Sequence, residues 1–157
     1  MMLFTDMAID LSTDMVRVVT NKNDDIKIIR PKNEGIDVET IHDELLIKYI
    51  LKSSMSKMPL VKPRVIVSVP YDFSECDRKK LKETFLQSGA KKCFLIETPM
   101  LSAIGSGVNL RDENANLIVE IGVSSTRITL ISLGGIILSE NIFMGAKEIH
   151  KSVYSLV

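Results

Sequence analysis

Short apolar runs with the spacing of β-strands occupy the first part of the chain. Met7–Leu11 and Met15–Thr20 are two such runs, and Ser12-Thr13-Asp14 between them are residue types that favour turns by bonding to their own backbone. Ile26–Ile29 is a third run, and it follows a second polar turn. The pattern therefore predicts a meander of three antiparallel strands.

From Thr40 onward the apolar residues recur at intervals of three and four, which predicts a helix of about four turns. Thr40 and Asp43 have the spacing of a capping box at its start. Arg64–Val69 is apolar almost throughout, which is typical of a strand that is covered on both faces. The chain thus changes from hairpins to alternating helices and strands.

This alternation continues, and a second meander follows it. The remaining predicted elements are a charged helix from Ser74 to Gly89, a strand over Cys93–Ile96, a short helix over Pro99–Ile104, three strands over Leu117–Ile121, Arg127–Leu133 and Ile136–Phe143 with Gly134-Gly135 as a hairpin turn, and an amphipathic segment after Gly145. Parallel strands need crossovers, and crossovers cover the sheet. Antiparallel strands followed by β-α units therefore predict an α/β fold with a mixed sheet flanked by helices.

The composition fits a soluble globular protein of one domain, or of one and a half small domains. The chain has 157 residues, of which 45% are hydrophobic and 25% charged, and its formal net charge is zero. This balance gives no electrostatic reason to expect nucleic acid as a partner. No window is apolar enough for a membrane span, so we expect a cytoplasmic protein. Met1–Phe4 is a candidate for peripheral contact with the inner face of the cell membrane.

Cysteine and histidine are too few for a disulfide framework or a metal cluster of recognisable spacing. Cys76 and Cys93 are the two cysteines, and His42 and His150 are the two histidines. We therefore expect reduced thiols, no metal bound by histidine and no cysteine nucleophile.

Two segments of the chain repeat the same pattern. Ile9–Val19 and Val119–Thr129 each carry an acid at the end of an apolar strand, a turn of small polar residues, and an arginine seven positions after the acid. Such turns can bind nucleotide phosphates through backbone N–H groups and hydroxyls, while the acids Asp10 and Glu120 hold metal-bound water. Two unrelated hairpins with serine-rich turns would give the same pattern.

Several longer segments resemble the MreB family of bacterial actins. The resemblance lies in Lys62–Pro70, Glu75–Ala90 and Phe94–Gly107, with further matches at Leu130–Ile136 and Ile29–Gly35. It implies the actin-like ATPase fold, which has two ribonuclease-H-like halves with ATP and magnesium in the cleft between them. It also implies membrane-bound filaments that organise cell-wall synthesis and rod shape. On this pattern residues 1–108 form the first half and residues 109–157 an incomplete start of the second.

The resemblance also implies a set of site residues, carried over position by position. The candidate nucleotide-binding residues are Asp10, Ser12, Thr13, Glu120, Gly122, Ser124, Ser125 and Thr126, with Asp10 and Glu120 as candidate magnesium ligands.

Both phosphate loops depart from the family pattern. The first, Asp-Leu-Gly-Thr-Ala-Asn-Thr in the family, is here Asp10–Val16 with serine in place of glycine. The second has one glycine, Gly122, where the family has three. The water-activating glutamate of the family falls on Thr98, which lacks a carboxylate. We therefore expect ATP and magnesium binding to be weak or lost and hydrolysis to be slow or absent, so no catalytic residue is assigned.

The chain is also short relative to the family pattern. On this pattern we expect the stretch between Val19 and Ile26 to be too short for the small outer subdomain of the first half, and the adenosine-contacting segment of the second half to be missing. Our first hypothesis is a divergent MreB-like cytoskeletal protein that contacts itself or a full-length filament without hydrolysing ATP. A second is a weak ATP and magnesium switch, or a filament-forming ATPase, whose site is completed by association. A third is a fragment of an ordinary filament-forming shape determinant.

Overall fold

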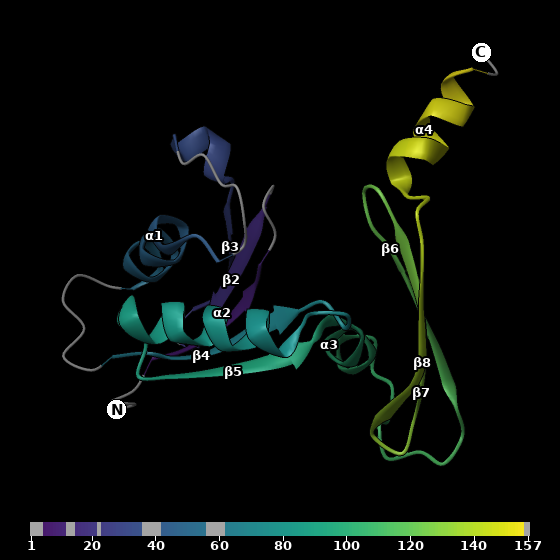
Figure 1. Ribbon diagram of the computed structural model, residues 1–157, viewed down its shortest axis with the longest axis horizontal. Helices are drawn as coiled ribbons and strands as arrows, with labels where there is room; N and C mark the ends of the chain where they lie inside the picture. Colours follow the sequence, from purple (N-terminus) through teal and green to yellow (C-terminus); the bar gives the residue numbers. More distant parts are fainter. Residues whose placement is uncertain (1–4, 12–14, 22, 36–41, 56–61, 156–157) are drawn as a thin grey trace. The chain divides into compact units, whose positions relative to one another are not determined.

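The computed structural model describes residues 5–11, 15–21, 23–35, 42–55 and 62–155 (Figure 1). Contacts divide the chain into two compact units, Met1–Ile96 and Glu97–Val157, and each is described by itself. This division groups the short helix that follows Ile96 with the second unit. The sequence pattern predicted a domain boundary after residue 108, and that assignment of domains stays a prediction.

The first unit contains a mixed five-stranded sheet in the order β3-β2-β1-β4-β5. Its elements are β1 (Asp6–Asp10), β2 (Val16–Thr20), β3 (Asn23–Ile29), the 3-10 turn η1 (Pro31–Glu34), α1 (Glu44–Ser54), β4 (Arg64–Val69), α2 (Glu75–Gln87) and β5 (Lys92–Glu97). Strand β1 runs antiparallel to β2 and parallel to β4, and β2 runs antiparallel to β3. The predicted meander and the predicted α/β class with a mixed sheet are confirmed.

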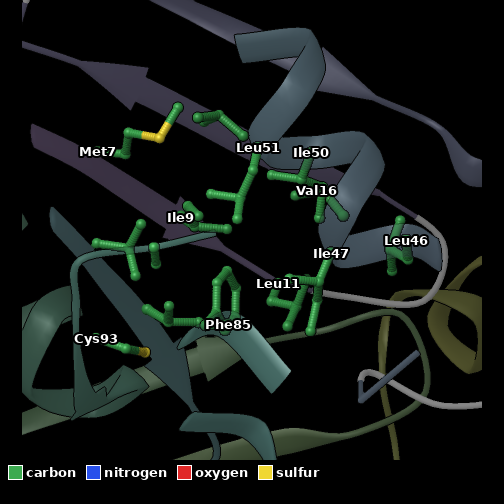
Figure 2. Packing of buried hydrophobic residues seen from close by; sticks show 14 of the residues in the cluster. Met7, Ile9, Leu11, Val16, Leu46, Ile47, Ile50, Leu51, Phe85 and Cys93 are labelled. Carbon is green, nitrogen blue, oxygen red and sulfur yellow. The ribbon is translucent and has the colours of Figure 1, made fainter. Parts of the chain in front are cut away.

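One face of this sheet forms the main hydrophobic core. Alternate residues such as Ile9 in β1 and Val67 in β4 point to the same face, where they pack against α1 and α2. Figure 2 shows Ile9 and Val16 next to Leu51 of α1, with Phe85 of α2 closing the cluster. Each large side chain buried in this way contributes about 1.5–3 kcal/mol to folding.

The opposite face of the sheet carries exposed apolar side chains. Ile66 of β4 is 42% exposed and Phe94 of β5 is 51% exposed. The expectation that Arg64–Val69 is covered on both faces is therefore wrong for Ile66. Both helices of the described part of this unit pack against the other face.

Helices α1 and α2 each begin at a capping side chain, and the cap of α1 differs from the one predicted from the sequence. Helix α1 begins at Glu44, since the Asp43 carboxylate accepts a hydrogen bond from the Leu46 N–H at 3.0 Å. Thr40, the predicted cap, lies outside the described residues. Helix α2 has the expected cap, because Ser74 Oγ accepts from the Asp77 N–H at 3.1 Å. Gly89 follows it with φ +114°, a conformation that favours glycine.

The second unit contains a three-stranded antiparallel sheet in the order β6-β7-β8. Its elements are α3 (Thr98–Gly105), β6 (Asn116–Ile121), β7 (Thr126–Ser132), β8 (Gly135–Ile142) and α4 (Ala146–Tyr154). The predicted second meander and its two flanking helices are confirmed. No described helix is both long enough and apolar enough to span a bilayer.

Helix α3 covers one face of this sheet through a small cluster that contains Ala103, Ile118 and Ile131. Strand side chains alternate between faces, so Leu117 and Val119 point to the other face. These two side chains are 63% and 51% exposed. Strand pairing places Leu138, which is 54% exposed, on that same face. We call the face of β6, β7 and β8 that carries Leu117, Val119 and Leu138 the open apolar face.

The β7–β8 hairpin turns at Leu133-Gly134 rather than at the predicted Gly134-Gly135. Ser132 pairs with Gly135, so the two residues between them form the turn. Both have positive φ, +48° at Leu133 and +75° at Gly134. A leucine in the left-handed region costs roughly 1–2 kcal/mol, so this turn is strained at its first position.

Replacing Leu133 with asparagine should stabilise the second unit by about 1 kcal/mol, because Asn-Gly suits a turn with positive φ at both positions. Leu133 is 69% exposed, so little buried area is lost. Urea unfolding would measure the change in the free energy of unfolding. Gly134→Ala should shift it in the opposite direction, and equal effects of both variants would contradict the assigned turn.

His42 is a buried histidine at the junction of α1 and α2. Its ring stacks on Phe73 with centroids 5.3 Å apart, its side chain is 9% exposed, and Nε2 lies 3.5 Å from Asp77 Oδ1. Burial lowers the pKa of His42 below its ordinary value of 6.5, and the nearby Asp77 carboxylate only partly opposes this. The folded protein therefore favours the neutral imidazole.

The stability of the protein should fall as the pH is lowered through 6.5, since the unfolded chain takes up a proton that folded His42 resists. Thermal melts between neutral and mildly acidic pH would measure this as a drop in Tm. His42→Phe keeps the stacking and should remove that part of the pH dependence. His150 is exposed, so His150→Gln is the matched control, and an equal effect of both variants would refute the assignment.

Candidate functional site

Asp10 ends β1 and has two hydrogen-bond donors within its own unit. Arg17, its cross-strand partner in β2, contacts Oδ2 at 2.8 Å, and Ser68 Oγ of β4 donates to Oδ1 at 2.8 Å. The arginine seven positions after the acid in the repeated pattern is thus its partner across the hairpin. Asp10 and Arg17 are nearly half exposed, so the pair adds at most about 1 kcal/mol to stability.

Glu120 occupies the equivalent place in the second unit. It lies near the end of β6, is paired in register with Arg127 of β7, and accepts a hydrogen bond from Ser102 Oγ of α3 at 2.6 Å. Each repeated acid therefore has an arginine opposite it in the hairpin and a serine hydroxyl from a neighbouring element. The short distance from Ser102 is typical of a hydroxyl that donates to a charged carboxylate.

The β6–β7 turn supports the start of α4. The Gly122 N–H donates to the Ser125 carbonyl at 2.8 Å, which closes the turn. The Gly122 and Val123 carbonyls accept from the Ala146 and Lys147 N–H groups, both at 2.9 Å. These are first-turn helix donors that have no partner inside the helix.

Gly145 makes this close approach possible. A Cβ at this position would lie 2.6 Å from the carbonyl carbon and oxygen of Val123 and 2.7 Å from the Gly122 oxygen. Glu148 caps the helix by accepting from the Gly145 N–H at 3.1 Å, and this hydrogen bond lowers the pKa of Glu148. The last amphipathic segment thus begins at a position that requires glycine.

The other predicted site residues have varied surroundings. Ser12 and Thr13 lie outside the described residues. Ser124 is exposed and Ser125 half-buried, while Thr126 Oγ1 donates to the Met144 carbonyl at 2.7 Å. Asp10 lies in the first unit and Glu120 in the second, so each is described within its own unit.

Thr98, at the position of the expected catalytic glutamate, is the first residue of α3 and is half-buried. A threonine hydroxyl does not titrate in the range of a carboxylate, so this side chain cannot act as a general base in the same way.

The assignment of Asp10 and Glu120 as magnesium ligands stays a prediction. The described residues contain no group of three or more histidine, cysteine, aspartate or glutamate side chains placed to hold a metal ion directly. One carboxylate oxygen of Asp10 is already paired with Arg17, whose positive charge opposes a cation there. The donor set around Asp10 therefore does not fit directly bound magnesium.

The two cysteines differ in environment. Burial raises the pKa of the Cys93 thiol to about 11, and Cys76 is exposed on α2. Cys93 is therefore a protonated core residue, because a reactive cysteine needs its thiolate.

Ser68 and Ser102 are site residues that the sequence pattern did not identify. Ser68 is the one polar residue within the apolar part of β4, and Ser102 interrupts the apolar helix α3. Those interruptions are the only sequence signal for them, and neither indicates which acid the hydroxyl meets.

Comparison with known proteins supplies the family. The sequence model described as MreB/Mbl protein matches residues 5–157. The chain belongs to the MreB/Mbl family. The resemblance found in the sequence is thereby confirmed.

Among its relatives, the cell shape-determining protein MreB of Pasteurella multocida is 30% identical over 133 residues, which cover 84% of this chain and 38% of that protein. The chain thus spans less than half the length of this curated MreB/Mbl relative.

Two solved structures confirm the actin-like fold. MreB5 of Spiroplasma citri bound to AMPPNP aligns with a TM-score of 0.73 and 21% identity, covering 98% of this chain and 56% of that chain. A MamK double helical filament aligns with a TM-score of 0.69 and 13% identity, covering 96% and 57%. The fold class predicted from the sequence is therefore correct.

Gly145→Ala should detach α4 from the β6–β7 turn of this MreB/Mbl chain. The new Cβ would meet backbone atoms that cannot rotate away, and overpacking of this kind costs about 1–3 kcal/mol. Hydrogen exchange of the Ala146 and Lys147 amides should accelerate. Gly105→Ala is the matched control, because a Cβ there meets nothing within 4 Å. Unchanged protection at Ala146 would contradict the proposed constraint.

Proposed function

We propose that this MreB/Mbl family chain is a cytoskeletal protein that acts through contacts with other protein chains, without hydrolysing ATP. The curated relatives are named cell shape-determining proteins, and a structurally similar protein forms a double helical filament. These relatives support a role in rod shape and filament organisation. The partner would be a second copy of this chain or a full-length MreB-type filament.

The open apolar face is the observation that carries this proposal. Leu117 and Ile121 of β6 are each 63% exposed, and Ile142 of β8 is 47% exposed. Glu140 also lies on this face, but so many exposed apolar side chains together are uncommon on a protein surface that meets only water. Covering such area contributes about 25 cal/mol per Å², which favours association with another chain.

Helix α4 adds to the apolar surface of the second unit. Ile149 and Val153 are four residues apart and therefore lie on one face of the helix, and they are 48% and 58% exposed. No residue of this helix is buried within the described chain. The apolar stripe of α4 is a second surface that favours a protein partner.

The absence of hydrolysis is supported by the residues at the candidate nucleotide site. Thr98 replaces the expected carboxylate base, and Asp10 is engaged by Arg17 and Ser68. A catalytic base must be able to take a proton from water near neutral pH. We therefore propose that the chain does not hydrolyse ATP. We also propose that ATP and magnesium bind weakly or not at all, because Asp10 is already engaged by Arg17 and Ser68.

A weak nucleotide-dependent switch is the second candidate. It is favoured by the β6–β7 turn, because α4 is attached to that turn by two backbone hydrogen bonds. A ligand at the turn would therefore act directly on the start of the helix. MreB5, which shares the fold, was crystallised with AMPPNP and with ADP. In this candidate the site is completed by association with another chain.

We further propose that the protein acts in the cytoplasm, at the inner face of the cell membrane. The proposal rests on the apolar sequence Met1–Phe4, which lies outside the described residues. Nucleic acid is not proposed as a partner, because positive and negative charges balance over the chain.

Titration calorimetry with ATP and magnesium separates the two candidate functions. We expect no saturable heat at millimolar nucleotide from the well-folded protein. Saturable binding would instead favour the switch.

Co-sedimentation with polymerised full-length MreB tests the contact surface. The protein should sediment with the filament, and Leu117→Lys combined with Val119→Lys should weaken this at least about tenfold, since both side chains lie on the open apolar face. Leu45→Lys is the matched control, because Leu45 is 71% exposed on α1 of the other unit. Equal loss in both variants, or no loss in either, would refute the assigned surface.

A further inference from the structure

A groove surrounds the outer edge of β5 in the first unit. Strand β5 is the last strand of the five-stranded sheet, so one side of its backbone faces away from β4. The groove has a volume of about 850 Å³. The residues that form its two walls are Arg78, Lys79 and Lys82 on the side of α2 and Ile66, Phe94 and Ile96 on the other side.

The α2 wall of the groove is positively charged. Lys79 and Lys82 are exposed, and Arg78 Nε donates to the Phe73 carbonyl at 3.2 Å, which fixes this arginine near the start of the helix. Among the described residues that line the groove, Glu75 is the one acid, against three cations. Lys82 of α2 and Cys93 of β5 both line the groove.

The opposite wall is apolar. Phe94 of β5 and Ile66 of β4 are 51% and 42% exposed, and both point away from the core face of the sheet. Cys93 lies on the α2 side of the same strand. Successive side chains of β5 therefore alternate between the core beneath α2 and the exposed apolar face, and the cations at the groove come from α2.

We propose that this groove binds an extended acidic segment of a partner protein, which adds as a further strand along the edge of β5. An edge strand presents backbone N–H and C=O groups that an added strand can pair with. Side chains of the added strand alternate in direction, so acidic residues would meet Lys79 and Lys82 while apolar residues meet Phe94. The segment recognised is therefore one in which acidic and apolar residues alternate over about the length of β5.

This inference does not depend on the proposed function. It uses only residues of the first unit, whereas the contact surface proposed above lies in the second. If the experiment on the groove fails, the proposal for the open apolar face is unaffected, and the reverse also holds. A second copy of this chain is the alternative occupant of the groove, and the experiment distinguishes it.

The direct test uses a short fluorescein-labelled peptide in which glutamate and valine alternate. Fluorescence anisotropy with the full chain should show saturable binding that weakens as salt is added. The same peptide with every backbone amide N-methylated keeps its charge but has no N–H to donate from either edge, so it should bind at least roughly tenfold more weakly. Equal binding of both peptides would mean attraction of a polyanion only and would overturn the proposal.

Protein variants test the cationic wall. Lys79→Glu combined with Lys82→Glu should reduce affinity for the peptide at least roughly tenfold, because attraction becomes repulsion. Lys80→Glu is the matched control, since Lys80 is an exposed residue of the same helix that does not line the groove. Both lysines of the double variant are exposed, and unchanged thermal melts would verify folding. Equal loss in the control would overturn the assignment.

The oligomeric state of the chain provides the last readout. We expect that sedimentation of the chain is the same for the wild type and for the double variant at Lys79 and Lys82. If the peptide fails to bind while the double variant abolishes self-association, the groove is occupied by a second copy, and the proposed acidic partner is wrong.

Discussion

Alternate side chains of β1 and β4 pack against α1 and α2 in one hydrophobic core. This packing determines which side chains of the two strands lie on the exposed face of the sheet. Ile9 and Val67 are buried in the core together with Phe85 of α2. Because the strands alternate, the same packing directs Ile66 and Phe94 to the opposite face. It also holds Asp10 at the end of β1, where Arg17 and Ser68 reach it. The core thus determines the position of Asp10 and of the exposed apolar residues of the first unit.

The two repeated hairpins place their acids by the same geometry but support them differently. Asp10 receives a hydroxyl from the neighbouring parallel strand, whereas Glu120 receives one from a helix packed on the sheet. In the second unit the turn after the acid also accepts hydrogen bonds from α4, through an approach that only Gly145 permits. Because the turn is hydrogen-bonded to the helix in this way, a displacement of the turn moves the start of α4, whether or not a phosphate is bound at the turn. This is why the switch remains a coherent second candidate beside the proposed contact function.

Much of the fold could be predicted from the sequence because its signals are local. The cap at Ser74 and the glycine after α2 are set by residues within a few positions of each other. The sequence predicted a capping box from Thr40 to Asp43, whereas Asp43 itself caps α1. The predicted turn at Gly134-Gly135 is displaced by one residue, because Leu133 adopts the left-handed conformation that usually favours glycine. The hydroxyl partners of the two acids could not be predicted. The approach of Ser68 to Asp10 depends on the register of β1 against β4, which is a long-range pairing.

The exposed surfaces of the two units have different chemistry, and this difference bears on what they can bind. The open apolar face is mostly apolar, with Glu140 as a charged residue on it, so it favours a partner with a largely apolar surface. The groove at β5 offers cations, an apolar wall and the last strand of a sheet, so it favours an extended chain of defined charge pattern. On the two proposals, the second unit contacts a folded partner and the first unit an extended segment. Two weak contacts that act together hold a chain far more tightly than either alone, provided that the linkage lets both form. A protein that does not hydrolyse ATP cannot use hydrolysis to control where it binds. On the two proposals, the combined affinity of the two contacts does so instead.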